Sequence, residues 1–147
     1  MFEHGVIRYG LLRLMYALSI IVAGSIGLLM VLSPSSVNSL MAMPTDNPMV
    51  YGIAGSVFLA VALLSVLGLR SPLRFVPVLL MELVYKTIWI VAVALPAYIN
   101  GNFPSWAVTT VVIFLVFIIG DLVAIPFWTL FEKEPVSKKK AKATKAI

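Results

Sequence analysis

The sequence predicts an all-α integral membrane protein built as a bundle of four membrane-spanning helices. The 147-residue chain is 61% hydrophobic and only 12% charged, about half the ~25% charged residues of soluble domains. Its apolar residues form long runs, and about 20 apolar residues in a helix cross a ~30 Å hydrocarbon core. Four such runs occupy most of the chain, so no room remains for a soluble catalytic domain.

Helix-breaking residues divide the apolar sequence into its spans. The first run ends before Pro34, the second before Pro72, and the third at Asn100-Gly101, while Pro135 marks the exit from the fourth. Proline disfavours a helical conformation at the residue before it and cannot donate a backbone hydrogen bond. The spans are therefore expected at about 9–32, 50–69, 73–99 and 105–131.

The basic residues predict the orientation of the bundle. Ten of the eleven Lys and Arg residues lie near the N-terminus, in the turn between spans two and three, or after span four. The loops 33–49 and 100–104 contain none. By the positive-inside rule both termini are cytoplasmic and the chain lies in the inner (plasma) membrane. The first run is longer than the apolar region of a signal peptide, so we interpret it as a retained span.

The polar segments outside the spans have simple expected roles. Residues 1–132 form the transmembrane domain, and residues 133–147 form a basic cytoplasmic tail that we expect to be disordered. Attraction of this tail to anionic lipid accounts for the net charge of +5 without a nucleic-acid partner. In the outer loop, Val37, Leu40 and Met41 have the spacing of a short amphipathic helix. That helix serves either as an interfacial anchor or as a lid over an outer-facing pocket.

Ionisable residues inside the spans are the main candidates for a functional site. Glu82 and Lys86 lie one turn apart in span three, and Asp121 lies in span four. A charge at mid-bilayer costs about 2.5–3.5 kcal/mol, so such residues face protein or water. Counted from the inner face, Glu82, Asp121 and Lys86 lie about 13, 15 and 20 Å deep. Arg13 in span one can reach toward them, and the four residues would form a neutral network.

Aromatic residues share the expected faces of these helices. Tyr85 and Trp89 follow Glu82 and Lys86 along one stripe of span three, and Tyr16 lies on span one. Two interpretations stay open: structural bonding between the spans, or a polar pocket for a ligand, a quinone head group or a proton. The candidate ligand-binding or buried polar cluster comprises Arg13, Tyr16, Glu82, Tyr85, Lys86, Trp89 and Asp121. On span four, the matching stripe is Phe114, Phe117, Asp121, Ile125 and Trp128.

Composition limits the chemistry, and small residues indicate close helix packing. The chain has no cysteine and one histidine, so we predict no metal site and no catalytic residue. Gly52, Ser56 and Ala60 recur at four-residue spacing, as do Ala23 and Gly27. Such ridges allow close approach of helices. They serve either packing between spans one and two or dimerisation.

The layout resembles the DoxX-like group of small four-span bacterial membrane proteins and its uncharacterised relatives. The resemblance covers about residues 10–130. It rests on Arg13, on Gly24 and Gly27 before LLMVLSP, on GIAGSVFLAVALLSVLGLRSP, and on a polar third span. Some members are similar to subunits of membrane oxidoreductases that use quinones. The resemblance therefore implies a quinone-adjacent or accessory role.

Three functions follow from these expectations. The first is a non-catalytic accessory or small-molecule-binding protein of the inner membrane, and the second is a quinone-binding subunit of a membrane oxidoreductase. The third, a small transporter or proton conductor, is disfavoured because span two has no counterpart of the charges in span four. The expected partners are the lipid bilayer and either other membrane subunits or a second copy, and quinone is the only cofactor considered.

Overall fold

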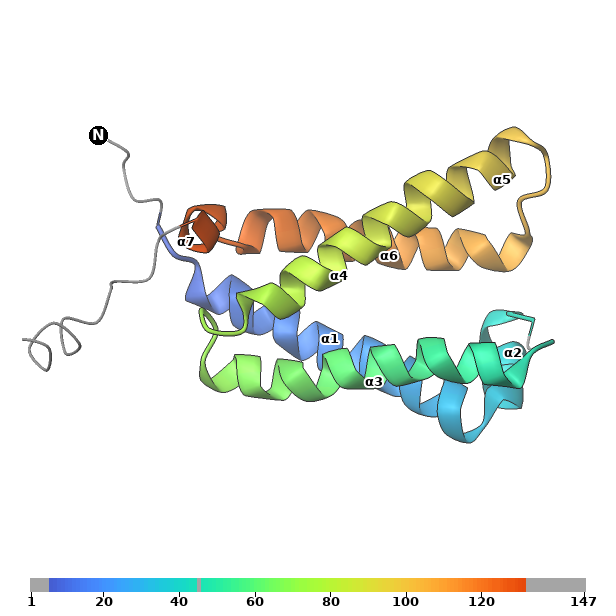
Figure 1. Cartoon of the computed structure of the whole chain (residues 1–147), viewed down its shortest axis with the longest axis horizontal. Helices are drawn as coiled ribbons and strands as arrows, with labels where there is room; N and C mark the ends of the chain where they lie inside the picture. The colour runs from blue at the N-terminus through green and yellow to red at the C-terminus, as the bar shows by residue number, and fades with distance from the viewer. Residues whose placement is uncertain (1–5, 45, 132–147) are drawn as a thin grey trace, which may run out of the picture.

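A computed structural model describes residues 6–44 and 46–131, and within these residues every regular element is a helix (Figure 1). Four helical segments are long and apolar enough to cross a membrane, which indicates a multi-pass membrane protein. The predicted basic tail lies outside the described residues. The elements are α1 (Tyr9–Leu32), α2 (Pro34–Met41), α3 (Pro48–Arg70), α4 (Val76–Trp89), the π-helical turn η1 (Ile90–Ala94), α5 (Leu95–Ile99), α6 (Ser105–Ala124) and α7 (Phe127–Phe131).

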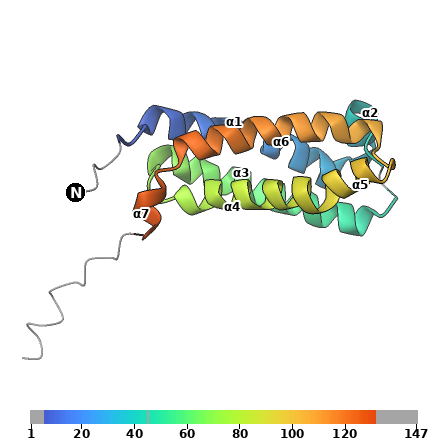
Figure 2. The ribbon, with the colours of Figure 1, turned by 90° about the horizontal axis from the view of Figure 1, so that it is seen from above.

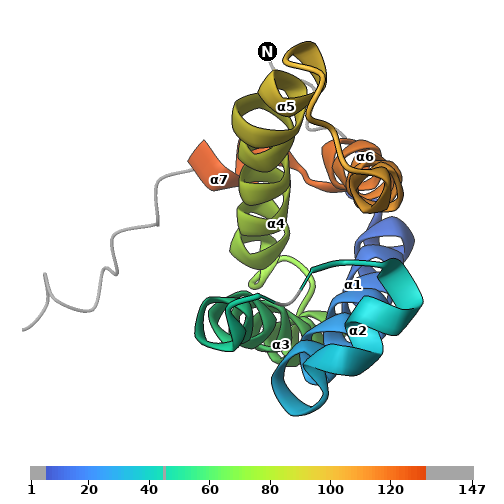
Figure 3. The same ribbon diagram turned by 90° about the vertical axis from the view of Figure 1, so that its right-hand side faces the viewer.

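The long helices run roughly along one axis (Figure 2). Contacts between neighbouring helices form a ring in the order α1, α3, α4, α6. Helices α1 and α3 pack extensively, and contacts of α1 with α6 and of α3 with α4 close the ring. Viewed from the end that carries α2, the four helices are arranged around a common axis (Figure 3). The other end of the bundle carries the start of α1, the turn between α3 and α4, and α7. We call these the α2 end and the α7 end.

Glycines bring the backbones of α1 and α3 together. A Cβ atom added at Gly27 would lie 2.8 Å from the carbonyl oxygen of Gly55 and 2.9 Å from the amide nitrogen of Leu59. Only a residue without a side chain allows this approach. A Cβ added at Gly52 would meet nothing within 4 Å, and the Gly52 ridge borders an open groove beside Met30 and Val31 of α1. The two helices therefore pack through Gly55 rather than through Gly52.

At the α7 end the bundle is closed by a compact core. Tyr16 is fully buried, and its hydroxyl donates a hydrogen bond to the carbonyl oxygen of Pro72 at 2.7 Å. Its ring lies so close to Gly68 that a Cβ there would be 2.5 Å from the ring. The Met15 sulfur fills the same kind of space over Gly120. The core residues come from α1, α4, α6 and the α6–α7 turn: Leu12, Met15, Tyr16, Val76, Leu79, Leu83, Phe117, Ala124 and Ile125.

Two spans depart from the predicted boundaries. The third begins at Val76 rather than at residue 73, because residues 71–75 form the turn from α3. The fourth does not run unbroken to residue 131: α6 ends at Ala124, and Ile125 is extended with φ −71° and ψ 120°. Pro126 follows at once, and the residue before a proline disfavours the helical conformation. The chain restarts as the short helix α7.

The outer loop forms the predicted short helix, with one difference in its apolar face. Val37 is only 1% exposed, whereas Leu40 is 73% exposed. Pro34 opens α2, where its missing amide hydrogen costs nothing. Ala42 ends the helix in a left-handed conformation with φ 52°, and the chain then returns to α3.

Candidate ligand-binding cavity and buried charge cluster

The centre of the bundle holds a buried ion pair on α4. Glu82 is fully buried and Lys86 is 3% exposed, and the Lys86 ammonium donates to the Glu82 carboxylate one helical turn earlier. The Lys86 Nζ atom also lies 4.1 Å from the ring centroid of Phe117 on α6. The rings of Tyr85 and Phe114 follow at 5.2 and 5.9 Å. One carboxylate and three aromatic rings thus take the place of water around this ammonium.

Asp121 adds a second carboxylate to the same region. It is fully buried, and neither of its oxygens has a hydrogen-bond partner among residues 6–44 and 46–131. It lies within electrostatic range of both Glu82 and Lys86. The cluster of Glu82, Lys86 and Asp121 therefore sets two acidic groups against one basic group. With all three ionised it carries one uncompensated negative charge in a low-dielectric interior.

The structure does not bring Arg13 into this cluster. The Arg13 side chain is exposed and forms no ion pair with any residue that the structure describes. The reason is helical geometry: the neighbouring Leu12 and Tyr16 share the buried face of α1, and Arg13, about 100° further round the helix, falls on another face. The expected neutral network of four residues is reduced to the three residues of the cluster.

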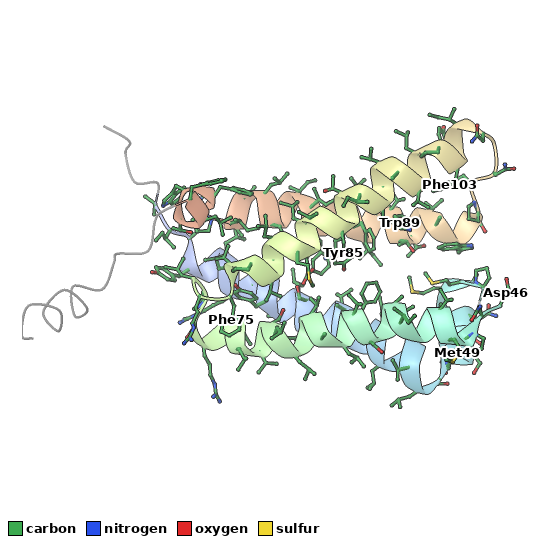
Figure 4. All side chains as sticks on the ribbon, in the orientation of Figure 1. Asp46, Met49, Phe75, Tyr85, Trp89 and Phe103 are labelled. Carbon is green, nitrogen blue, oxygen red and sulfur yellow. The ribbon has the colours of Figure 1, made fainter. Side chains whose placement is uncertain are left out.

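Tyr16 has a structural position instead of a place on a ligand wall. Its hydroxyl is bonded to the backbone of Pro72, which ties α1 to the turn before α4. Tyr85 and Trp89, in contrast, are half-buried and point into the region between the two helix pairs (Figure 4). Of the seven residues predicted from the sequence, Glu82, Lys86 and Asp121 form the buried cluster, and Tyr85 and Trp89 line a cavity beside it.

That cavity measures about 740 Å³ and lies between the pair α1–α3 and the pair α4–α6. Tyr85 and Phe114 belong both to its wall and to the surroundings of Lys86, so its deep end adjoins the ion pair. Asp46 and Asn47 lie at the α2 end, where the two helix pairs diverge (Figure 4). The lining is otherwise mostly apolar, with methionines Met30, Met41 and Met43.

Aromatic rings form much of the cavity wall. Tyr85 packs edge-on against Phe114 with centroids 5.9 Å apart, and Trp89 packs edge-on against the same ring at 5.3 Å. The ring centroid of Phe58 on α3 lies 6.1 Å from that of Tyr85 on the neighbouring helix α4. Thr110 lines the cavity at 8% exposure, and its hydroxyl has no partner in the described part of the chain. The cavity wall thus combines an aromatic surface with a few polar groups, among them the Thr110 side chain.

Sequence reasoning missed part of this wall. Phe58 and Thr110 carry no charge and lie in runs that are apolar throughout, so periodicity alone did not set them apart. Trp106 fits an interfacial anchor by position, yet it lines the cavity. Met41 agrees with one of the predicted roles of α2. As a lid, this helix would lie over an outer pocket, and Met41 does line the cavity.

Comparison with known proteins gives no match: no family model, no curated sequence and no solved structure is similar to this chain. The DoxX-like resemblance consequently stays a prediction from layout, and function must be argued from the site.

Proposed function

We propose that this chain is a non-catalytic membrane protein that binds a lipophilic small molecule between its two helix pairs. The observation that carries the proposal is the cavity of about 740 Å³ with its largely apolar and aromatic wall. Ligand sites of drug-sized molecules are typically clefts of about 300–1,000 Å³ lined by such residues, with few polar groups. Here Thr110 and the Lys86–Glu82 pair supply polar groups in the wall and beneath the deep end.

The proposed setting is the inner membrane with the α7 end in the cytoplasm. Arg8, Arg13, Arg70 and Arg74 all belong to segments at that end, and the positive-inside rule assigns such an end to the cytoplasm. The cavity then opens toward the opposite side, and α2 with its following loop borders the mouth. This arrangement favours the lid role of the segment over a purely anchoring role.

The test compares a substitution to phenylalanine at two neighbouring positions of α3, one inside the cavity wall and one outside it. Ala54 lines the cavity, whereas a side chain at Gly52 meets nothing within 4 Å. The full chain and the variants Ala54→Phe and Gly52→Phe are purified from native membranes, and bound lipophilic molecules are extracted and measured by mass spectrometry. We expect a molecule enriched over bulk lipid in the wild type and in Gly52→Phe, and its loss in Ala54→Phe.

Two results would overturn the proposal. One is that no molecule is enriched with any of the three proteins. The other is that Ala54→Phe retains the same molecule at the same stoichiometry, because the molecule would then occupy a surface other than the cavity.

A quinone-binding subunit is the second candidate, and the free hydroxyl of Thr110 favours it. A quinone is a flat apolar ring with two carbonyl acceptors, and a buried hydroxyl donor without a partner is suited to one of them. If this candidate holds, the extracted molecule is a quinone, and Thr110→Val reduces its amount while leaving the cavity volume nearly unchanged.

A further inference from the structure

We propose that the cavity selects lipophilic monocations, such as quaternary ammonium or phosphonium compounds, over anions of the same size and shape. This inference rests on the proposed function, because it names the ligand class of the same cavity. Three independent features of the wall and its surroundings support it.

The first feature is the aromatic surface. Tyr51, Phe58, Tyr85, Trp89, Trp106 and Phe114 all line the cavity. Aromatic faces carry partial negative charge, and cages of several rings are the usual protein site for quaternary ammonium groups. The protein already uses this chemistry one layer deeper, where the Lys86 ammonium lies against Tyr85, Phe114 and Phe117.

The second feature is the sign of the formal charges. Among the described residues that line the cavity, Asp46 is the only one with a formally charged side chain. No lysine or arginine of residues 6–44 and 46–131 lines the wall. An anion would therefore enter an aromatic surface with a carboxylate at the mouth and no basic group in contact.

The third feature is the absence of a net positive charge in the buried cluster. The positive charge of Lys86 is matched by Glu82, so it offers little net attraction to an anion. The Asp121 carboxylate has no ion-pair or hydrogen-bond partner in the described structure. The cluster thus presents no net positive charge to the cavity side of Tyr85 and Phe114, so nothing in it compensates an anion that leaves water.

The experiment uses two probes that match in size and shape and differ in charge sign. Tetraphenylphosphonium and tetraphenylborate are titrated into the full-length protein in nanodiscs, with subtraction of their partition into protein-free nanodiscs. Trp89 and Trp106 line the cavity, so quenching of intrinsic tryptophan fluorescence reports occupancy. We expect saturable binding of the phosphonium at least tenfold tighter than binding of the borate.

A pair of tryptophan variants locates the binding. Trp89→Leu removes a ring from the cavity wall, and we expect it to weaken phosphonium binding about tenfold. Trp128→Leu is the control, because Trp128 lies on α7, is 38% exposed and is not among the cavity residues. Calorimetry gives the affinities of both variants without depending on the fluorescence of the substituted residue.

The outcomes separate this inference from the proposed function. If the borate binds saturably as tightly as the phosphonium, or more tightly, the charge selectivity is wrong while the cavity remains a lipophile site. If Trp89→Leu and Trp128→Leu weaken phosphonium binding equally, the cation is bound outside the cavity and the inference fails. If neither probe binds saturably, the inference fails, and the mass spectrometry of extracted molecules decides separately on the proposed function.

Discussion

The two helix pairs of this bundle are built on different chemistry. Helices α1 and α3 meet backbone to backbone at Gly27 and Gly55, and the described part of this interface contains no ionisable side chain in an ion pair. Helices α4 and α6 contact each other less extensively and meet through aromatic rings and the buried Glu82, Lys86 and Asp121.

This difference assigns the pairs different tasks. A glycine interface has one close-packed arrangement, so the α1–α3 pair suits the role of a rigid base. The α4–α6 pair holds the costly groups, and intramembrane ionisable residues mark functional regions by default. It also contains the π-helical turn η1 directly after Trp89 and the break at Pro126, and π-helical turns occur frequently at functional sites. Both pairs line the cavity, and the second pair adds the buried charges beneath its deep end.

The largest expected effect comes from removing one partner of the buried ion pair. Lys86→Met leaves the Glu82 carboxylate buried without a counter-charge, close to the carboxylate of Asp121. Loss of one member of a buried pair typically costs about 3–5 kcal/mol. We expect a loss of this size in the free energy of unfolding, measured by equilibrium unfolding in mixed detergent micelles.

Two further variants sharpen this result. The double variant Glu82→Gln with Lys86→Met removes both charges and should recover most of the lost stability. Arg13→Met removes an exposed basic residue of α1 and should change stability by less than about 1 kcal/mol. Equal losses of unfolding free energy for Lys86→Met and Arg13→Met would show that the buried ion pair matters no more than an exposed charge. The proposed difference between the two helix pairs would then be wrong.

The next effect concerns the glycine interface between α1 and α3, where a larger side chain should lower stability. Gly27→Leu forces a side chain against the backbone of α3, where even a Cβ atom would lie 2.8 Å from the Gly55 oxygen. Overpacking of a close contact typically costs about 1–3 kcal/mol. We expect a lower midpoint in thermal unfolding of the purified protein. The same substitution at Gly52 meets nothing within 4 Å and serves as the control. A comparable loss at both positions would mean that helix α1 does not need the close approach.

The sequence predicts the base well and the binding surface only in part. Long apolar runs and prolines located the four helical segments, and α1 begins and ends at the predicted residues 9 and 32. Asp121, Glu82 and Lys86 were identified because charges in apolar runs are conspicuous. Phe58 and Thr110 do not stand out, because in an apolar run a residue of the cavity wall differs from a lipid-facing one only through the arrangement of the helices. Depth along the helix does not predict the position of Arg13, because its side chain lies on a different face of α1 from the buried Leu12 and Tyr16.

A smaller effect is expected at the junction between the two pairs. Tyr16→Phe removes the hydroxyl that donates to Pro72 and leaves that buried carbonyl without this bond. A typical buried hydrogen bond contributes about 0.5–1.5 kcal/mol, and the expected loss in the free energy of unfolding lies in that range. Tyr98→Phe is the control, because Tyr98 is 70% exposed on α5. If Tyr16→Phe is as stable as Tyr98→Phe, the turn before α4 is positioned by packing alone.

The smallest effect concerns the mouth of the cavity rather than stability. Asp46 is exposed, so its charge acts on an entering cation through water and is screened by salt. Asp46→Asn should weaken tetraphenylphosphonium binding only about two- to threefold at low salt, with a difference that disappears near 1 M salt. The loss from Trp89→Leu should in contrast persist at high salt, because a ring inside the cavity is shielded from ions. Salt-independent weakening by Asp46→Asn would place this carboxylate in direct contact with the ligand, and the connection between α2 and α3 would then contribute to binding as directly as Trp89 does.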